Sequence, residues 1–204
     1  YCTKQADGTW SPPVPLPGII NSSYKETSVS ITEDGNTLYF SSDRPGGSGG
    51  FDIYSCTKDS RGNWSRTRNL GPTINTPLDE DSPFIDYDGK TLFFSSQGRE
   101  GMGGFDIYKS TLINAETNEW SVPENLGYPI NTPDDDIFYV STKNGGRGYY
   151  SSVREDGLGY SDIYLITATE DKKEPVVAST NNTPVETPSE EPQSPPVDAA
   201  KPAE

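Results

Sequence analysis

The chain has 204 residues, a formal net charge of −15, no histidine and 30% hydrophobic residues, with 20 glycines and 18 prolines. Such an acidic chain is not expected to bind nucleic acid, because phosphate contacts need clustered lysine and arginine. The lack of histidine removes the usual general base and the commonest metal ligand. No hydrophobic run reaches the ~18–20 residues of a membrane span. We therefore expect no membrane span, no cofactor and no metal.

A repeat of 54 and then 56 residues organises the sequence. The stretches Phe40–Tyr54, Phe94–Tyr108 and Tyr150–Tyr164 each contain a Ser-Ser pair, a glycine-rich loop and an Asp-Ile-Tyr triplet. Three tryptophans (Trp10, Trp64 and Trp120) and the Ile-Asn pairs that begin at 20, 74 and 130 keep a similar step. A constant period indicates one supersecondary unit stacked against copies of itself, so these tryptophans are expected to be structural.

The chain begins partway through a repeat, because Cys2–Trp10 aligns with Cys56–Trp64. We therefore expect a fragment with further repeats upstream. Cys2 and Cys56 hold equivalent positions in successive units. They are predicted to lie on equivalent strands too far apart for a disulfide, which is the alternative interpretation.

The first strands of two repeats are predicted at 27–32 and 82–87, each before an Asp-Gly dipeptide, with Asn144-Gly145 at this register in the last repeat. These dipeptides tolerate the positive φ that two-residue hairpins demand. The second strands are predicted at 37–42, 91–96 and 148–152. In the first two of these strands, Leu-Tyr-Phe and Leu-Phe-Phe put apolar residues on both faces, which indicates burial on both sides.

The third strands are predicted to begin at Phe51, Phe105 and Ser161, and the fourth at each tryptophan. Prolines inside the fourth strand (Pro12, Pro13, Pro15 and Pro123) place it at an outer edge. Four antiparallel strands per unit are typical of a β-propeller blade. The sequence thus predicts an all-β partial propeller over residues 1–168, with about three four-stranded blades that form half of a six-bladed ring. The last blade lacks its fourth strand.

Residues 169–204 carry many prolines and acidic residues and no aromatic residue. Such a segment cannot bury enough apolar surface to offset the entropy of ordering it. It is predicted to be a disordered linker that leads to another domain.

The aspartates of the Asp-Ile-Tyr triplets, Asp52, Asp106 and Asp162, allow two interpretations. They could converge on a central channel as acid, base or ligand groups, or accept hydrogen bonds within their own blades. A ring has one channel and many blades, so a residue present in every blade favours the structural role. We therefore predict no catalytic residue.

Two acidic clusters, Asp79–Asp81 and Asp134–Asp136, precede first strands. Calcium needs six or more oxygens from a tight loop, and the sequence has no Asp-x-Asp-x-Asp-Gly spacing. Solvated loop charge is the predicted explanation. Glu26, Glu80 and Asp136 nevertheless occupy one register and could share a structural role.

The glycine-rich loops do not fit a phosphate site, because a strand follows each loop and no lysine is near. They are predicted to turn tightly, with Arg44 and Arg99 projecting at the rim. Thr57–Trp64 resembles the Asp-box turn of sialidase propellers, but Arg61 replaces its glycine, which disfavours a glycosidase. If the chain binds a partner directly, the candidates are Arg44, Ser48, Arg99, Met102, Arg154 and Leu158.

Asp-Gly-x-x-Leu-Tyr/Phe-Phe-Ser-Ser, a loop and Asp-Ile-Tyr resemble the WD-like propeller repeat of TolB-type periplasmic proteins. GGFDIY, WSxPxNLG and INTP resemble the propeller of OmpA-family, peptidoglycan-associated outer-membrane proteins. Within that group the chain is similar to the periplasmic component of the type IX secretion and gliding machinery. The resemblance covers about residues 1–168 and departs from the pattern at Ser161.

This resemblance implies a non-enzymatic protein-interaction scaffold in the periplasm, associated with the outer membrane. Its implied partners are envelope or outer-membrane proteins, and peptidoglycan would bind only through an OmpA-like domain outside these residues. Two alternatives stay open. One is a glycan-active hydrolase or lyase that uses carboxylates among Asp79–Asp81 and Asp134–Asp136. The other is a calcium- or ligand-binding propeller.

Overall fold

A computed structural model describes residues 1–167, and all the regular structure in this range is β-strand. The predicted linker at 169–204 lies outside the described residues. No helix in the described range is long and apolar enough to cross a membrane. The prediction of an all-β fold is confirmed.

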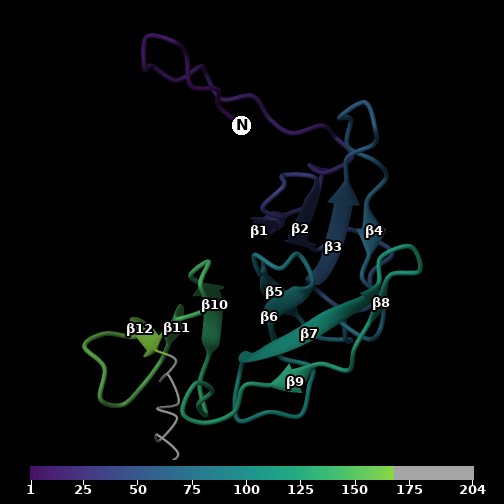
Figure 1. Ribbon diagram of the computed structural model, residues 1–204. Coiled ribbons are helices and arrows are strands. Elements are labelled where there is room, and N and C mark those ends of the chain that lie inside the picture. Colours follow the sequence, from purple (N-terminus) through teal and green to yellow (C-terminus); the bar gives the residue numbers. More distant parts are fainter. Residues whose placement is uncertain (168–204) are drawn as a thin grey trace, which may run out of the picture. The chain divides into compact units, whose positions relative to one another are not determined.

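Three antiparallel sheets follow one another along the chain, and each corresponds to one blade (Figure 1). The first sheet contains β1 (Glu26–Ile31), β2 (Thr37–Ser42), β3 (Asp52–Thr57) and β4 (Arg68–Asn69). The second contains β5 (Glu80–Ile85), β6 (Thr91–Ser96), β7 (Asp106–Asn114), β8 (Glu119–Trp120) and β9 (Glu124–Asn125). The third contains β10 (Asp136–Ser141), β11 (Arg147–Ser152) and β12 (Asp162–Thr167). The predicted partial propeller is therefore present.

The turn between the first two strands of each blade contains the predicted Asp-Gly or Asn-Gly dipeptide. Gly35, Gly89 and Gly145 have φ of 70°, 67° and 66°, whereas the residue before each is not in the left-handed region. The Gly35 N–H donates to the Thr32 carbonyl and the Thr32 N–H to the Thr37 carbonyl, so the tight turn sits inside a four-residue loop. The predicted antiparallel turn at each dipeptide is confirmed, and only its glycine takes the positive φ.

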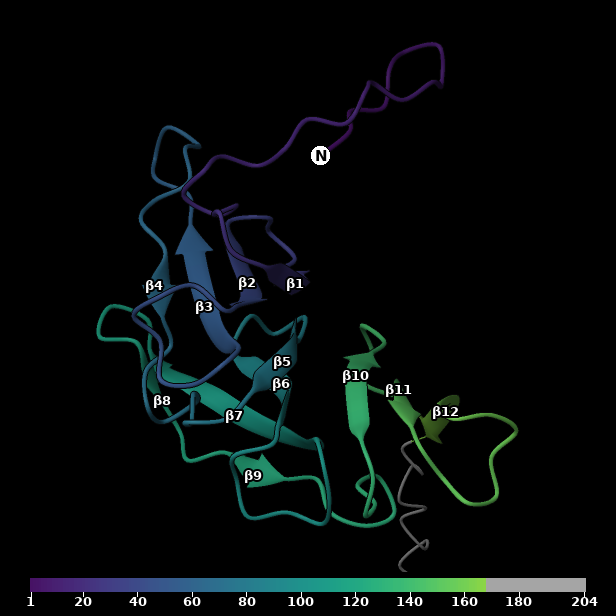
Figure 2. The ribbon, with the colours of Figure 1, turned by 180° about the vertical axis from the view of Figure 1, so that it is seen from behind.

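The fourth strand is shorter and starts later than predicted. Trp64 and Trp120 instead close a hairpin against the end of the preceding third strand, where Lys58 pairs with Trp64 and Leu112 with Trp120. Figure 2 shows β8 and β9 beside different parts of β7, and β9 begins just after Pro123. Around Pro12, Pro13 and Pro15 there is no strand. The prolines therefore do more than place the fourth strand at an edge: they prevent backbone pairing around themselves and so shorten the strand.

The core lies between sheets, because each second strand is covered on both faces in the first two blades. Phe40 and Phe94 are almost fully buried, and Tyr39 meets Trp120 of the next blade edge-on at a centroid distance of 6.0 Å. In the third blade, β11 alternates between buried and exposed residues instead. The predicted burial on both sides is therefore confirmed for β2 and β6, the two strands for which it was made.

Candidate functional site: the glycine-rich loops and their supports

Each glycine-rich loop is closed by the aspartate of the Asp-Ile-Tyr triplet that follows it. The Asp52 carboxylate accepts the backbone N–H of Ser48 at 2.5 Å and that of Gly49 at 3.3 Å. The later loops repeat the first bond, from the Met102 N–H to Asp106 at 2.6 Å and from the Leu158 N–H to Asp162 at 2.7 Å. A carboxylate held by loop N–H groups fixes the path of the loop backbone.

Glycine is needed beneath these aspartates for space. A Cβ on Gly47 would lie 1.7 Å from a carboxylate oxygen of Asp52, and one on Gly101 would lie 1.7 Å from Asp106. Neither glycine has a left-handed φ. These glycines therefore allow the tight turn because they leave room for the loop to approach its own carboxylate, and not because of a left-handed backbone.

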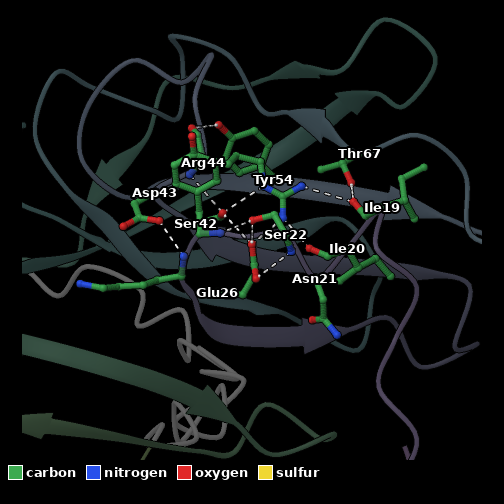
Figure 3. Close-up of polar contacts among 12 residues, drawn as sticks. Ile19, Ile20, Asn21, Ser22, Glu26, Ser42, Asp43, Arg44, Tyr54 and Thr67 are labelled. Atoms are coloured by element: carbon green, nitrogen blue, oxygen red, sulfur yellow. Dashed lines mark hydrogen bonds and ion pairs between the residues drawn. The ribbon is translucent and has the colours of Figure 1, made fainter.

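Arg44 reaches back from the first loop to the segment before β1 (Figure 3). Its guanidinium donates to the carbonyls of Ile19, at 3.3 Å, and Ile20, and to the Ser42 hydroxyl at 3.0 Å. It also forms an ion pair with Glu26 at 2.8 Å. The side chain is only 13% exposed. This arginine joins a loop to the preceding connection.

Arg99 and Arg154 repeat this arrangement in the second and third blades. Arg99 donates to the carbonyls of Thr73 and Ile74, the latter at 2.9 Å. Arg154 donates to those of Pro129 and Ile130, the latter at 3.1 Å. All three guanidinium groups lie over aromatic rings, at 4.6–5.9 Å from the ring centroids. The prediction that Arg44 and Arg99 project at the rim is wrong, because carbonyl and aromatic contacts draw these side chains inward.

A carboxylate at the start of each first strand supports the same region. Glu80 is fully buried and accepts the Thr76 N–H and hydroxyl, both at 2.6 Å, and the Ser96 hydroxyl at 2.7 Å. Asp136, also fully buried, accepts the Thr132 N–H at 2.6 Å. Solvated loop charge was therefore the wrong explanation for these two residues. Their shared register is the signal that pointed to this role.

The neighbouring acidic residues also hold backbone. Asp79 accepts the Phe51 N–H at 2.8 Å, and Asp135 accepts the Phe105 N–H at 2.9 Å. These bonds join the loop of one blade to the connection that enters the next. Within residues 1–167 no group of three or more Asp, Glu, Cys or His residues is placed to hold a metal ion.

Burial and hydrogen bonding shift the pKa values of these carboxylates in opposite directions. Burial raises the pKa of Glu80 and of Asp136, and the bonds from their Thr and Ser partners only partly offset it. Burial also acts to raise the pKa of Glu26, but hydrogen bonds from Ser22, Arg44 and Ser42 outweigh it and lower that pKa. Burial raises the pKa of Asp52 against the bonds from its loop.

Two asparagines that sequence reasoning used only as repeat markers have a specific role. The Asn75 side chain accepts the Ile53 N–H at 2.8 Å and donates to the Ile53 carbonyl at 3.0 Å. Asn131 makes the same pair of bonds with Ile107, at 2.8 and 2.9 Å. The amide thus takes the place of a neighbouring strand at the edge of the third strand. The repeated Ile-Asn pair was the available signal.

The loop tips, Ser48, Met102 and Leu158, are what these supports present to solvent. Their backbone N–H groups are held by the aspartates, whereas their side chains are exposed, with 43% exposure for Met102 and 101% for Leu158. Ser48 and Arg99 line one open pocket of about 420 Å³ at the junction of the first two blades. Of the six residues predicted for binding, the three loop tips are therefore accessible to a partner, whereas the three arginines already bond to carbonyls of the chain itself.

The two cysteines are not bridged. Cys2 is exposed, whereas Cys56 is buried and its thiol donates to the Ser65 carbonyl at 2.9 Å. The tryptophans differ in burial, from 64% exposure at Trp10 to 4% at Trp120. Trp120 alone of these two packs against a ring of the preceding blade.

No protein-family profile and no curated protein matches the chain. Among solved structures, TolB from Acinetobacter baumannii is similar at 15% identity with a TM-score of 0.49, over 79% of this chain and 33% of that one. A putative TolB from Agrobacterium tumefaciens is similar at 18% identity with a TM-score of 0.49, over 70% and 46%. Hydrazine synthase from Kuenenia stuttgartiensis follows at 16% identity and a TM-score of 0.39, over 60% and 35%. The chain spans less than half the length of each of these proteins.

Proposed function

We propose that this chain is a non-enzymatic protein-interaction module whose loop tips contact other proteins of the cell envelope. The observation that carries the proposal is the contrast within each loop. The backbone is held the same way in every blade by an aspartate and an arginine, whereas the tip changes from Ser48 to Met102 to Leu158. A fixed scaffold with variable exposed tips is typical of a binding surface.

The chemistry of the partner surface follows from the tips and their surroundings. Met102 and Leu158 offer apolar contacts, and the exposed acidic residues Glu100, Glu155 and Asp156 lie in the same loops. A complementary surface would place an apolar patch beside basic residues, because complementary charge favours encounter and suppresses wrong partners. The net charge of −15 supports the same choice of partner.

The non-enzymatic part of the proposal rests on what the polar groups already do. Asp52, Asp79 and Glu80 each accept backbone N–H groups of their own scaffold, and Asp106 and Asp135 repeat those roles one blade later. A glycan-active site would use carboxylates that differ between blades. The repetition supports a structural role instead.

The cellular context rests on the motifs. The resemblance of GGFDIY, WSxPxNLG and INTP to propellers of OmpA-family outer-membrane proteins supports a periplasmic, outer-membrane-associated protein. A role in type IX secretion or gliding is the finer form of this proposal. Peptidoglycan contact would then belong to a separate OmpA-like domain.

Site-specific photo-crosslinking in the native host tests the proposal. A crosslinking residue at Met102 or Leu158 is expected to capture a discrete envelope protein, and Met102→Asp with Leu158→Asp should abolish its co-purification. Val122, 84% exposed and outside the loops, is the matched control position. Equal capture from position 122, or capture of cytoplasmic proteins alone, would contradict the proposal.

A further inference from the structure

The sheet of β10, β11 and β12 has an apolar face that is buried in the other two blades. Ile53 and Ile107, the isoleucines of the first two Asp-Ile-Tyr triplets, are 0% exposed. Their counterpart Ile163 is 80% exposed, and its neighbours on the same face, Leu165 and Tyr149, are 53% and 37% exposed. A contiguous apolar face of this kind indicates an interaction surface when a complementary partner can be identified.

The chain itself shows what covers such a face. Leu70 and Ile74 pack in the same cluster as Ile53, while Asn75 bonds to the Ile53 N–H and carbonyl. The segment 126–131 repeats the edge pairing, since the Leu126 N–H and the Asn131 amide bond to Ile107. A Leu-x-x-x-Ile-Asn segment therefore covers the edge of a third strand, and the next blade covers the face beside it, since Ile85, Leu92 and Phe94 belong to the same cluster as Ile53.

Ile163 has the backbone geometry that receives this segment. It pairs with Ser151 in the same register as Ile53 with Ser41 and Ile107 with Ser95. Its N–H and carbonyl therefore point to the open edge of β12, as those of Ile53 point to Asn75. Among residues 1–167 no segment stands against Ile163 in this way.

A third Leu-x-x-x-Ile-Asn segment lies at 16–21, and it is preformed. The N–H groups of Ile20 and Asn21 donate to the Pro17 carbonyl, as those of Ile74 and Asn75 donate to the Gly71 carbonyl. One side of this segment packs against the first blade, with Ile20 in a cluster beside Phe40. The Asn21 side chain is exposed and donates to the Leu16 carbonyl, within its own turn.

We propose that the segment 16–21 of a second copy of this chain docks on the open edge and face of β12. Asn21 of one copy then bonds to the Ile163 N–H and carbonyl of the other. Leu16 covers the exposed apolar face together with Val29 and Ile31 of β1, which are 63% and 47% exposed and line the same open pocket as Leu16. The contact recreates the junction that residues 70–75 and 126–131 form within the chain. It is head-to-tail, so two copies close into a ring if the rotation allows, and otherwise a longer chain forms.

Sedimentation velocity of the full 204-residue chain over a range of concentrations tests this contact. The wild type is expected to self-associate. Ile163→Asp should weaken association at least about tenfold, because it buries a charge in the apolar contact. Asn21→Asp should also weaken it, because a carboxylate cannot donate to the Ile163 carbonyl. Both positions are exposed, so the thermal unfolding of the two variants should match that of the wild type.

Mixing the two variants supplies a sharper measurement. Asn21→Asp keeps an intact β12 face, and Ile163→Asp keeps an intact segment 16–21. A head-to-tail contact therefore predicts a heterodimer joined by one intact junction. Val122→Asp and Asn36→Ala, at exposed positions away from both surfaces, should associate like the wild type.

Three results would overturn the proposal. The first is a monomeric wild type at the highest soluble concentration. The second is association that Ile163→Asp leaves unchanged, or a mixture of variants that remains monomeric. The third is a monomer in which cysteines placed at Ile163 and Asn182 form an intramolecular disulfide, which would make the Asn182-Thr183-Pro184 segment of the same chain the occupant. None of these results bears on photo-crosslinking at the loop tips.

Discussion

The first and second glycine-rich loops are each supported by a glutamate and an arginine, Glu26 with Arg44 and Glu80 with Arg99, but the two pairs make different contacts. Under the first loop, Glu26 forms an ion pair with Arg44 at 2.8 Å, and the carboxylate is 18% exposed. Under the second, Glu80 is fully buried and accepts its hydrogen bonds from Thr76 and Ser96. No ion pair joins Glu80 to Arg99 within residues 1–167.

The difference shows which interaction the scaffold requires. Both carboxylates accept the N–H and hydroxyl of the residue four positions earlier, Ser22 for Glu26 and Thr76 for Glu80. The ion pair is present at one site and absent at the other. The constant part is therefore an acceptor that fixes the connection before the first strand, and the charge pair is an addition at the more exposed site.

Removing the carboxylates should give the largest effect. Glu80→Ala leaves the Thr76 N–H and hydroxyl and the Ser96 hydroxyl unpaired in the core, so we expect a loss of about 3–5 kcal/mol in the free energy of unfolding. Glu26→Ala should cost about 1–2 kcal/mol, because water can reach its former partners. Urea denaturation measures both values. Glu80→Gln, which keeps one acceptor oxygen, is the control and should lose less than Glu80→Ala; equal losses at the two sites would contradict the comparison.

Replacing the arginines by lysine should have the next largest effect. A lysine cannot span two carbonyls as a guanidinium does, so Arg99→Lys is expected to cost about 1–3 kcal/mol. Arg44→Lys should cost less, since an ammonium retains the ion pair with Glu26. Double-mutant cycles with Glu26→Gln and Arg44→Met, and with Glu80→Gln and Arg99→Met, measure the two couplings, because methionine removes the charge. Coupling between Arg99 and Glu80 as strong as that between Arg44 and Glu26 would show that the two sites do not differ.

Much of the blade was predictable because its signals are local and repeated. The 54-residue step, the turn glycines and the apolar second strands at 37–42 and 91–96 located the strands with small errors. The fourth strand was less predictable. Its tryptophan pairs backward with the third strand, and this pairing depends on the hairpin between them rather than on strand propensity.

The supports themselves could not be predicted fully, because their partners are distant in the chain. The local sequence predicts that an arginine in a glycine-rich loop is exposed. Arg99 turns inward because it donates to the carbonyls of Thr73 and Ile74, which lie some 25 residues away in the chain. Glu80 lies in a run of three acidic residues, and such a run predicts exposure to solvent. Only the packing of adjacent blades shows that one of the three is buried.

The two glutamates should also give opposite pH dependences. Burial raises the pKa of Glu80, so its contribution to stability is present below the pKa of the unfolded chain and is lost as pH rises through the folded pKa. Hydrogen bonds lower the pKa of Glu26, so its contribution is present above the unfolded pKa and is lost as pH falls through the folded pKa.

Urea denaturation of the wild type, Glu80→Gln and Glu26→Gln between about pH 3 and pH 7 separates these contributions. The stability advantage of the wild type over Glu80→Gln should shrink as pH rises, and its advantage over Glu26→Gln should grow. Parallel pH profiles for the two variants would show that burial does not raise the pKa of Glu80.

Changes at the loop tips should have the smallest effect on stability. Met102→Ser and Leu158→Ser are expected to change the free energy of unfolding by less than about 0.5 kcal/mol, because only the backbone N–H of each tip is held. Met102→Pro removes that N–H from Asp106 and should cost about 1–3 kcal/mol. If Met102→Ser destabilised the chain as much as Met102→Pro, the side chain would be part of the scaffold. A tip that is free in its side chain and fixed in its backbone can change its contacts with a partner without loss of the blade.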